Sequence, residues 1–311
     1  MAPDVPVSGG LFEITEDLSN TDPVRLHNAN QESDNNTRSV SLLTWYEGER
    51  NQYIGRGGLE ATILEALSHS RMITLHGSGG MGKTRLALHC AAQVSTQFSD
   101  GVVIIALADQ EPKLEAFAEA ISSALNITGQ ALLSENLIRF LSNKNMLILL
   151  DNYEVVDSQE VADYLARLFL KCKSVQLLVT GREAVKLADI EQIINCDNGM
   201  DELEAQQLFI LRAQLKRGMK WQPDQGDLVA IQRILQTTEA IPLAIELAAA
   251  WTDKRSLIEI ATNMETVPFG EATQMPPRSL HTNNADRHQS LERCYNWSFG
   301  LLEDWAQEGF A

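Results

Sequence analysis

Short apolar runs alternate with stretches of helical spacing along most of the chain after residue 53. The runs that predict buried strands are Arg71–His76, Val102–Ala106, Met146–Leu150, Val175–Val179 and Gln192–Cys196. The stretches between them that predict helices are Arg85–Val94, Pro112–Leu125 and Ser158–Leu170. Continuous apolar strands separated by helices are typical of a parallel sheet, because helices then cover both of its faces. The pattern therefore predicts an α/β domain built on such a sheet.

The strand pattern stops after Cys196, and helical spacing takes its place. Asp201, with Glu204 three residues later, is typical of a capping-box start to a helix. Leucines then recur on one face of that predicted helix, at Leu208, Leu211 and Leu215. Two more helices are predicted over Asp227–Leu235 and Pro242–Trp251, the second with proline in its first turn. The chain is therefore expected to continue as a small all-α helical domain.

Changes of composition mark the two ends of the chain. Residues 1–50 are mostly polar or small, with nine acidic against three basic side chains, and are expected to form a leader or linker. Two adjacent prolines indicate a second linker, and apolar residues at helical spacing follow it. The expected division is an acidic leader (1–50), an α/β domain (51–200), a helical domain (201–272), a linker (273–287) and the start of a truncated further domain (288–311).

Charge and composition exclude several classes of protein. The 311 residues include 44% hydrophobic side chains, which is enough for packed cores, and carry a formal charge of −17. The negative charge argues against nonspecific binding to nucleic acid or anionic membranes, because both carry the same sign. No apolar run reaches the roughly 18 residues of a membrane-spanning helix, and the start lacks a signal-peptide pattern. Because the four cysteines are also widely spaced, we expect a cytoplasmic protein.

One motif carries clear chemistry. Gly77–Thr84 matches the pattern GxxxxGK[ST] between a predicted strand and a predicted helix. Its glycines let successive backbone N–H groups face phosphate oxygens, and the following helix adds its positive dipole end. Lys83 is expected to reach the β- and γ-phosphates of ATP, and the Thr84 hydroxyl to coordinate Mg²⁺. The nucleotide-binding residues expected here are Gly77, Ser78, Gly79, Gly80, Met81, Gly82, Lys83, Thr84 and Arg85.

A P-loop of this kind needs an acid on a neighbouring strand to hold the magnesium ion. Asp151, directly after the apolar run Met146–Leu150, is the candidate. Glu154 is the candidate for the general base, because Asn152 cannot take up a proton; an exposed loop carboxylate is the alternative. Arg182 follows the fourth strand, whose carboxyl end faces the ligand crevice, so it would sense the γ-phosphate or else cap a helix. The expected catalytic residues are Lys83, Asp151, Glu154 and Arg182.

These motifs resemble the signal-transduction P-loop ATPases of the apoptotic and plant-resistance type, the NB-ARC-like or STAND class. The likeness is strongest to the bacterial branch found in large LuxR-type regulators. Leu147–Glu154 resembles that family's bacterial Walker B segment, and Leu178–Arg182 resembles its sensor segment. Gln289–Trp305 is similar to the opening of its winged-helix domain. The resemblance implies a P-loop NTPase sheet followed by a helical domain and the beginning of a winged helix.

The resemblance also implies contacts to the nucleoside. Tyr53–Arg56 resembles the family's short motif before the P-loop, which implies adenine contacts from Ile54 and Arg56. Ala240–Leu243 resembles its Gly-Leu-Pro-Leu motif, which implies that Pro242 touches the base.

By this resemblance the chain is an ATP/ADP-binding switch that hydrolyses ATP slowly with Mg²⁺, inside a larger signalling or transcription-regulating protein. ADP would hold the two domains closed, and ATP would open them and permit assembly of a homo-oligomer. Its other partners would be effector and sensor domains of the full-length protein; no membrane or direct nucleic-acid contact is expected from this segment. Two alternatives remain: a non-catalytic adaptor that holds nucleotide, supported by Asn152 in place of a second acid, and a small-molecule phosphotransferase.

Overall fold

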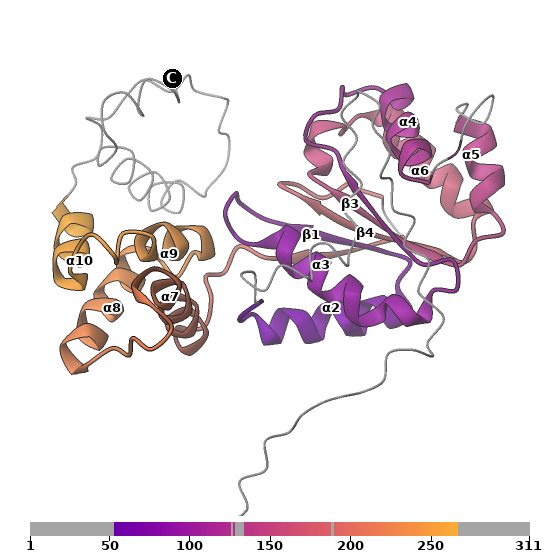
Figure 1. Ribbon diagram of the computed structural model, residues 1–311. Coiled ribbons are helices and arrows are strands. Elements are labelled where there is room, and N and C mark those ends of the chain that lie inside the picture. The colour runs from indigo at the N-terminus through magenta and orange to yellow at the C-terminus, as the bar shows by residue number, and fades with distance from the viewer. Residues whose placement is uncertain (1–52, 126, 128–133, 188–189, 267–311) are drawn as a thin grey trace, which may run out of the picture.

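The strands of the sheet are parallel and follow the order β2–β3–β4–β1–β5 (Figure 1). They are β1 (Met72–His76), β2 (Val102–Ala106), β3 (Met146–Asp151), β4 (Val175–Gly181) and β5 (Glu191–Asn195). The computed structural model describes residues 53–125, 127, 134–187 and 190–266. The predicted leader (1–50), linker (273–287) and further domain (288–311) lie outside the described residues.

Helices cover both faces of the sheet. They are α2 (Gly57–His69), α3 (Lys83–Val94), α4 (Leu114–Ala124), α5 (Ser134–Leu141) and α6 (Gln159–Lys171). Alternate residues of β3 point to opposite faces of the sheet and belong to two hydrophobic cores. Ile148 and Leu150 pack with α4, α5 and α6. Leu147 and Leu149 pack with α2 and α3. Figure 1 shows the two sets of helices on opposite sides of the sheet. The predicted α/β fold with helices on both faces is confirmed.

The observed strands lie within one or two residues of the predicted ones, but two helices of this domain were not predicted. Helix α2 buries only Ile63, Ala66 and Leu67, so its apolar stripe is too narrow to stand out in the sequence. Helix α5 buries Leu137, Ile138 and Leu141 in a single short segment. Both helices depend on the sheet for their burial, because helices this short are marginal alone.

Four helices form the second described domain. They are α7 (Glu202–Arg217), α8 (Gln225–Thr237), α9 (Pro242–Ala249) and α10 (Leu257–Thr266). Their shared core includes Phe209, Ile231, Ile245 and Ile260, each fully buried. Met81 of the P-loop packs into this same core, with 1% of its surface exposed. The glycine-rich loop is therefore attached to the helical domain by a side chain as well as to the sheet by its backbone.

The predicted capping box at the start of α7 is only half correct. Asp201 does cap the helix, since its side chain accepts a hydrogen bond from the Leu203 N–H. Glu204, however, accepts hydrogen bonds from the N–H groups of Arg56 at 2.7 Å and Gly57 at 3.0 Å. Gly57 begins α2, whose first N–H groups have no partner within the helix. Glu204 thus joins the helical domain to the segment before the P-loop.

Candidate functional site

The loop from β1 to α3 has a glycine-dependent shape. Gly77, Gly80 and Gly82 have φ angles of 153°, 76° and 77°, in the region that side chains rarely adopt. Gly82 directly precedes Lys83, the first residue of α3, so the positive end of that helix lies at the loop. A Cβ atom at Gly77 would lie 3.1 Å from Asp197 Oδ1. Loop and helix together form the kind of anion cradle that phosphate requires.

Lys83 lies over the beginning of its own loop. Its Nζ donates hydrogen bonds to the carbonyl oxygens of Gly77 at 2.7 Å and Ser78 at 2.8 Å. Burial lowers the pKa of Lys83, while the carboxylates of Glu154 and Asp197 act in the opposite direction. An anionic phosphate in the cradle would likewise favour the charged ammonium. Lys83 is therefore placed to exchange two carbonyl contacts for phosphate contacts.

Asp151 and Thr84, the two predicted magnesium ligands, are in direct contact. Thr84 Oγ1 donates to Asp151 Oδ1 at 2.6 Å, and Thr180 Oγ1 donates to the same oxygen at 2.5 Å. Thr180 also accepts a hydrogen bond from the Asn152 N–H at 3.1 Å. A hydroxyl and a carboxylate are oxygen ligands of the kind that Mg²⁺ takes, with phosphate and water completing its shell. The residues present thus fit a magnesium site that phosphate would complete. In the described part of the chain, no group of three or more His, Cys, Asp or Glu side chains is arranged to hold a metal ion by itself.

Thr180 was not among the predicted site residues. It lies at the carboxyl end of β4, one residue beyond Val179, which pairs with Leu150. This register brings Thr180 beside Asp151 at the end of β3. The signal in the sequence was a hydroxyl residue at the end of a buried strand, next to the predicted sensor arginine.

Glu154 and Arg182 form an ion pair at the same edge of the sheet. Arg182 Nε lies 3.3 Å from Glu154 Oε1, and the Arg182 side chain is 66% exposed. The other carboxylate oxygen, Oε2, is buried and has no hydrogen-bond partner among the described residues. A Cβ atom at Gly181 would lie 3.6 Å from that oxygen, an ordinary contact, and 3.0 Å from the Glu183 carbonyl oxygen. The predicted base and the predicted sensor are thus brought together, with one carboxylate oxygen left open to a further donor.

Asp197 is a second site residue that the sequence reasoning missed. Its Oδ1 accepts a hydrogen bond from the Ser78 N–H at 2.7 Å, which anchors the start of the P-loop to the end of β5. Only 9% of Asp197 is exposed. The available signal was the same as for Asp151, an apolar run that ends in an acid, since Asp197 directly follows the predicted strand Gln192–Cys196.

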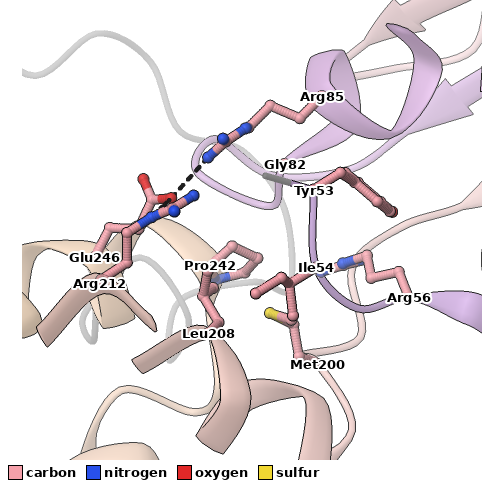
Figure 2. Close-up of a pocket in the computed structure, with 10 residues that line it drawn as sticks. All are labelled: Tyr53, Ile54, Arg56, Gly82, Arg85, Met200, Leu208, Arg212, Pro242 and Glu246. Atoms are coloured by element: carbon pink, nitrogen blue, oxygen red, sulfur yellow. Dashed lines mark hydrogen bonds and ion pairs between the residues drawn. The ribbon is translucent and has the colours of Figure 1, made fainter. Parts of the chain in front are cut away.

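A narrow pocket with a cavity volume of about 30 Å³ lies between the P-loop domain and the helical domain (Figure 2). The P-loop domain contributes Tyr53, Ile54, Arg56, Gly82 and Arg85, and the second side consists of Met200, Leu208, Arg212, Pro242 and Glu246. Figure 2 shows Ile54, Met200, Leu208 and Pro242 gathered at its centre. The Leu243 N–H donates to the Gly80 carbonyl oxygen at 3.2 Å, so the start of α9 is bonded to the P-loop itself. The predicted nucleoside residues Ile54, Arg56 and Pro242 therefore line one cavity next to the phosphate cradle.

Arg56 lines this pocket, but its guanidinium group is directed to backbone oxygens. It donates to the carbonyls of Cys196 at 3.0 Å and Asn198 at 2.9 Å. The residue is 7% exposed and has a left-handed backbone with φ of 62°. Burial lowers its pKa. Arg56 thus fixes the segment after β5, and its predicted contact with the nucleotide stays a prediction.

Arg85 reaches across the pocket mouth. Its Nη1 lies 2.7 Å from Glu246 Oε1, and Arg212 Nε lies 2.9 Å from the same oxygen. Figure 2 shows Arg85 extending from α3 to Glu246 on α9. The predicted nucleotide residue Arg85 is therefore part of a charged contact between the two domains.

The site has counterparts in known proteins. Residues 65–188 match the AAA domain family. The protein named "Putative HTH-type transcriptional regulator Rv0890c" of Mycobacterium tuberculosis is 30% identical over 248 residues, which are 78% of this chain and 26% of that protein. The "ToMV resistance protein Tm-2(2)" of Solanum lycopersicum is 26% identical over 266 residues, which cover 78% of this chain and 30% of that protein. The chain thus spans about a quarter of the mycobacterial relative's length.

A solved structure supports the fold. The Walker-type ATPase PABY2304 of Pyrococcus abyssi is similar with a TM-score of 0.52 at 13% identity, over 68% of this chain and 72% of that protein. This likeness concerns the fold alone. In the part of the chain that the structure describes, no helix combines the length and the apolar character needed to cross a membrane. Taken with the two sequence relatives, the comparisons confirm the resemblance that the motifs indicated.

Proposed function

We propose that this chain, which carries a P-loop NTPase domain of the AAA type and has relatives among HTH-type regulators and plant resistance proteins, is an ATP/ADP-binding switch. Nucleotide would bind with its phosphates at residues 77–84 and its nucleoside in the pocket lined by Ile54 and Pro242. The protein would hydrolyse ATP slowly and so return to the ADP-bound form.

The observation that carries this proposal is the position of the pocket between the two domains. Its walls come from the P-loop domain and from α7 and α9 of the helical domain. A ligand that touches both domains binds best to one arrangement of them, and it shifts the population by that difference in affinity.

The residues of the sheet edge support slow hydrolysis. Asp151 and Thr84 would hold Mg²⁺, which neutralises negative charge on the phosphates when bound. Lys83 would stabilise charge on the β- and γ-phosphates. Glu154 would accept a proton from the attacking water, but its pairing with Arg182 at 3.3 Å competes with that role. Slow turnover follows if Arg182 must first turn from Glu154 to the γ-phosphate.

A thermal-melt series with ADP and ATP tests nucleotide binding. At a free concentration of about 100 times Kd, ADP should add about 2.7 kcal/mol to the stability of the wild-type protein. Lys83→Ala should abolish the shift and keep a similar unliganded Tm, whereas Lys173→Ala, at an exposed lysine, should behave like wild type. If neither nucleotide raises the Tm of the wild-type protein, the proposal is refuted.

A non-catalytic adaptor is the second candidate, and the Glu154–Arg182 pair is the observation that favours it. Phosphate release separates the two candidates. If wild-type protein releases phosphate faster than the Asp151→Asn and Glu154→Gln variants, the switch hydrolyses ATP. Equal rates in all three would favour the adaptor.

We also propose a setting for the switch. The mycobacterial relative is named an HTH-type transcriptional regulator, and this chain matches about a quarter of it. The segment would then be the regulatory core of such a cytoplasmic protein, and its partners would be effector and sensor domains. ATP-driven opening would permit assembly into a homo-oligomer, which sedimentation of the full-length protein with ADP and with ATP would test.

A further inference from the structure

Arg212 lies in the wall of the pocket between the domains, where the proposed switch assigns it no role. It is on α7, one helical turn after Leu208, which lines the same pocket. Only 12% of the Arg212 side chain is exposed. In Figure 2 its guanidinium group lies beside Glu246 and next to Pro242. The side chain is thus a largely buried cation at the cavity where the nucleoside would bind.

Glu246 fixes the orientation of Arg212. Glu246 Oε1 lies 2.9 Å from Arg212 Nε and 2.7 Å from Arg85 Nη1, so the carboxylate is held from both domains. The Nη1 nitrogen of Arg212 is buried and has no hydrogen-bond partner among the described residues. A buried donor without an acceptor is costly, especially on a charged group. This nitrogen therefore favours a ligand that brings an acceptor into the pocket.

Besides Arg212, the polar side chains that line the pocket are Tyr53, Arg56, Arg85 and Glu246. Ile54, Met200, Leu208 and Pro242 can contact a flat ring, but their side chains cannot form hydrogen bonds to it. Pockets of this kind obtain their selectivity from a few well-placed polar groups. Among the polar lining residues, the guanidinium group of Arg56 is directed to two carbonyl oxygens. Tyr53 Oη and Arg56 Nε are also buried without a partner among the described residues, but Arg212 is the cation of the helical domain that has an unused donor in this pocket.

We propose that Arg212 is a specificity-determining residue that donates from Nη1 to an oxygen or ring nitrogen of the bound nucleoside, and that Glu246 is its positioning residue. This inference rests on the proposed function, because it requires a nucleotide in the pocket. It separates two parts of the site. Residues 77–84 recognise phosphate, and Arg212 recognises the nucleoside.

Calorimetric titration of the full chain with ADP and with pyrophosphate tests this division, because pyrophosphate lacks the nucleoside. Arg212→Gln should weaken ADP binding by about tenfold or more, the loss expected for a hydrogen bond from a charged group. Binding of pyrophosphate should stay within about twofold of wild type. Arg212→Lys, which keeps a cation for Glu246 but lacks the Nη1 donor, should lose ADP affinity in the same way. Arg233→Gln is the matched control, since Arg233 pairs with Glu265 away from the pocket.

Each outcome decides the proposal. Unchanged ADP affinity in Arg212→Gln would overturn the proposal and leave the proposed function intact. An equal loss of affinity for ADP and for pyrophosphate would also overturn it, because that result indicates a structural role for Arg212. Failure of the wild-type protein to bind ADP would overturn the proposed function and this inference together. Selective loss of ADP supports the inference. Wild-type binding of 2′-deoxy-ADP then narrows the acceptor: weakened binding points to the ribose 2′ oxygen, and unchanged binding points to the base or to another ribose oxygen.

Discussion

Two buried threonines on neighbouring strands give a sharp test of how the site is held together. Thr180 on β4 is 1% exposed and Thr74 on β1 is 0% exposed. Thr180 Oγ1 donates to the Asp151 carboxylate and accepts from the Asn152 N–H. Thr74 Oγ1 is buried and has no hydrogen-bond partner among the described residues. The same change, threonine to valine, therefore removes two hydrogen bonds at one position and an unpaired hydroxyl at the other.

The expected free energies differ in sign. Valine matches threonine closely in shape, so neither change leaves a cavity. Thr180→Val loses a hydrogen bond to a charged group and leaves the Asn152 N–H without its acceptor, for a total cost of about 2–4 kcal/mol. Thr74→Val removes a buried polar atom that had no partner, so we expect an effect between about zero and 1 kcal/mol of stabilisation.

Thermal and urea unfolding of both variants, without nucleotide, measure this difference. For a protein of this size, each kcal/mol corresponds to roughly 2–4 °C in Tm, so Thr180→Val should lower Tm by roughly 5–15 °C. Thr74→Val should leave Tm unchanged or raise it slightly. If the two variants lose stability equally, the Thr180–Asp151 bond does not hold the sheet edge and the reasoning is refuted.

Two further predictions concern charged contacts. Asp100 accepts hydrogen bonds from Lys144 Nζ and the Asn145 N–H, and these bonds lower the pKa of its carboxyl group. Asp100 therefore stabilises the folded protein fully above the unfolded pKa of about 4. This stabilisation is lost as the pH falls through the lower pKa of the folded state. Urea titrations at pH 7 should show Asp100→Asn less stable than wild type by about 1–2 kcal/mol, and this difference in stability should shrink in acid. An equal difference at pH 7 and in acid would contradict the prediction. Glu246→Gln weakens the contact of Arg85 and Arg212 across the pocket, so ADP should dissociate about tenfold faster, as a fluorescent-ADP chase would measure. An unchanged rate, equal to that of the Glu265→Gln control, would show that the contact does not retain the nucleotide.

Local chemistry explains why the core of the site could be predicted from sequence. The P-loop needs glycines, a lysine and a hydroxyl residue in a fixed order, since its backbone N–H groups must point inward. Asp151 could be predicted as well, because a P-loop needs an acid at the end of a neighbouring strand; the same signal at Asp197 was not recognised. The contact of Thr84 with Asp151 follows from the parallel order of β1, β4 and β3.

Long-range partners could not be predicted in the same way. Glu204 has the spacing of a capping box, yet its carboxylate bonds the Arg56 and Gly57 N–H groups, 147 or more residues away in sequence. The helical spacing of α7 does not reveal this, because an unpaired N–H at the start of another helix competes for the same carboxylate. Arg56 shows the same effect, since its guanidinium group is directed to carbonyl oxygens after β5.

By itself, the sequence determined the parallel sheet, the P-loop and the helical domain, because burial on both faces and phosphate binding each demand a local pattern of residue types. Only the tertiary structure decided which charged groups meet. Asp197 at the P-loop, Glu154 beside Arg182, and Glu246 between Arg85 and Arg212 all join segments that are distant in sequence. Their pairing depends on how the sheet edge and the helical domain face one another, and no local pattern records that arrangement.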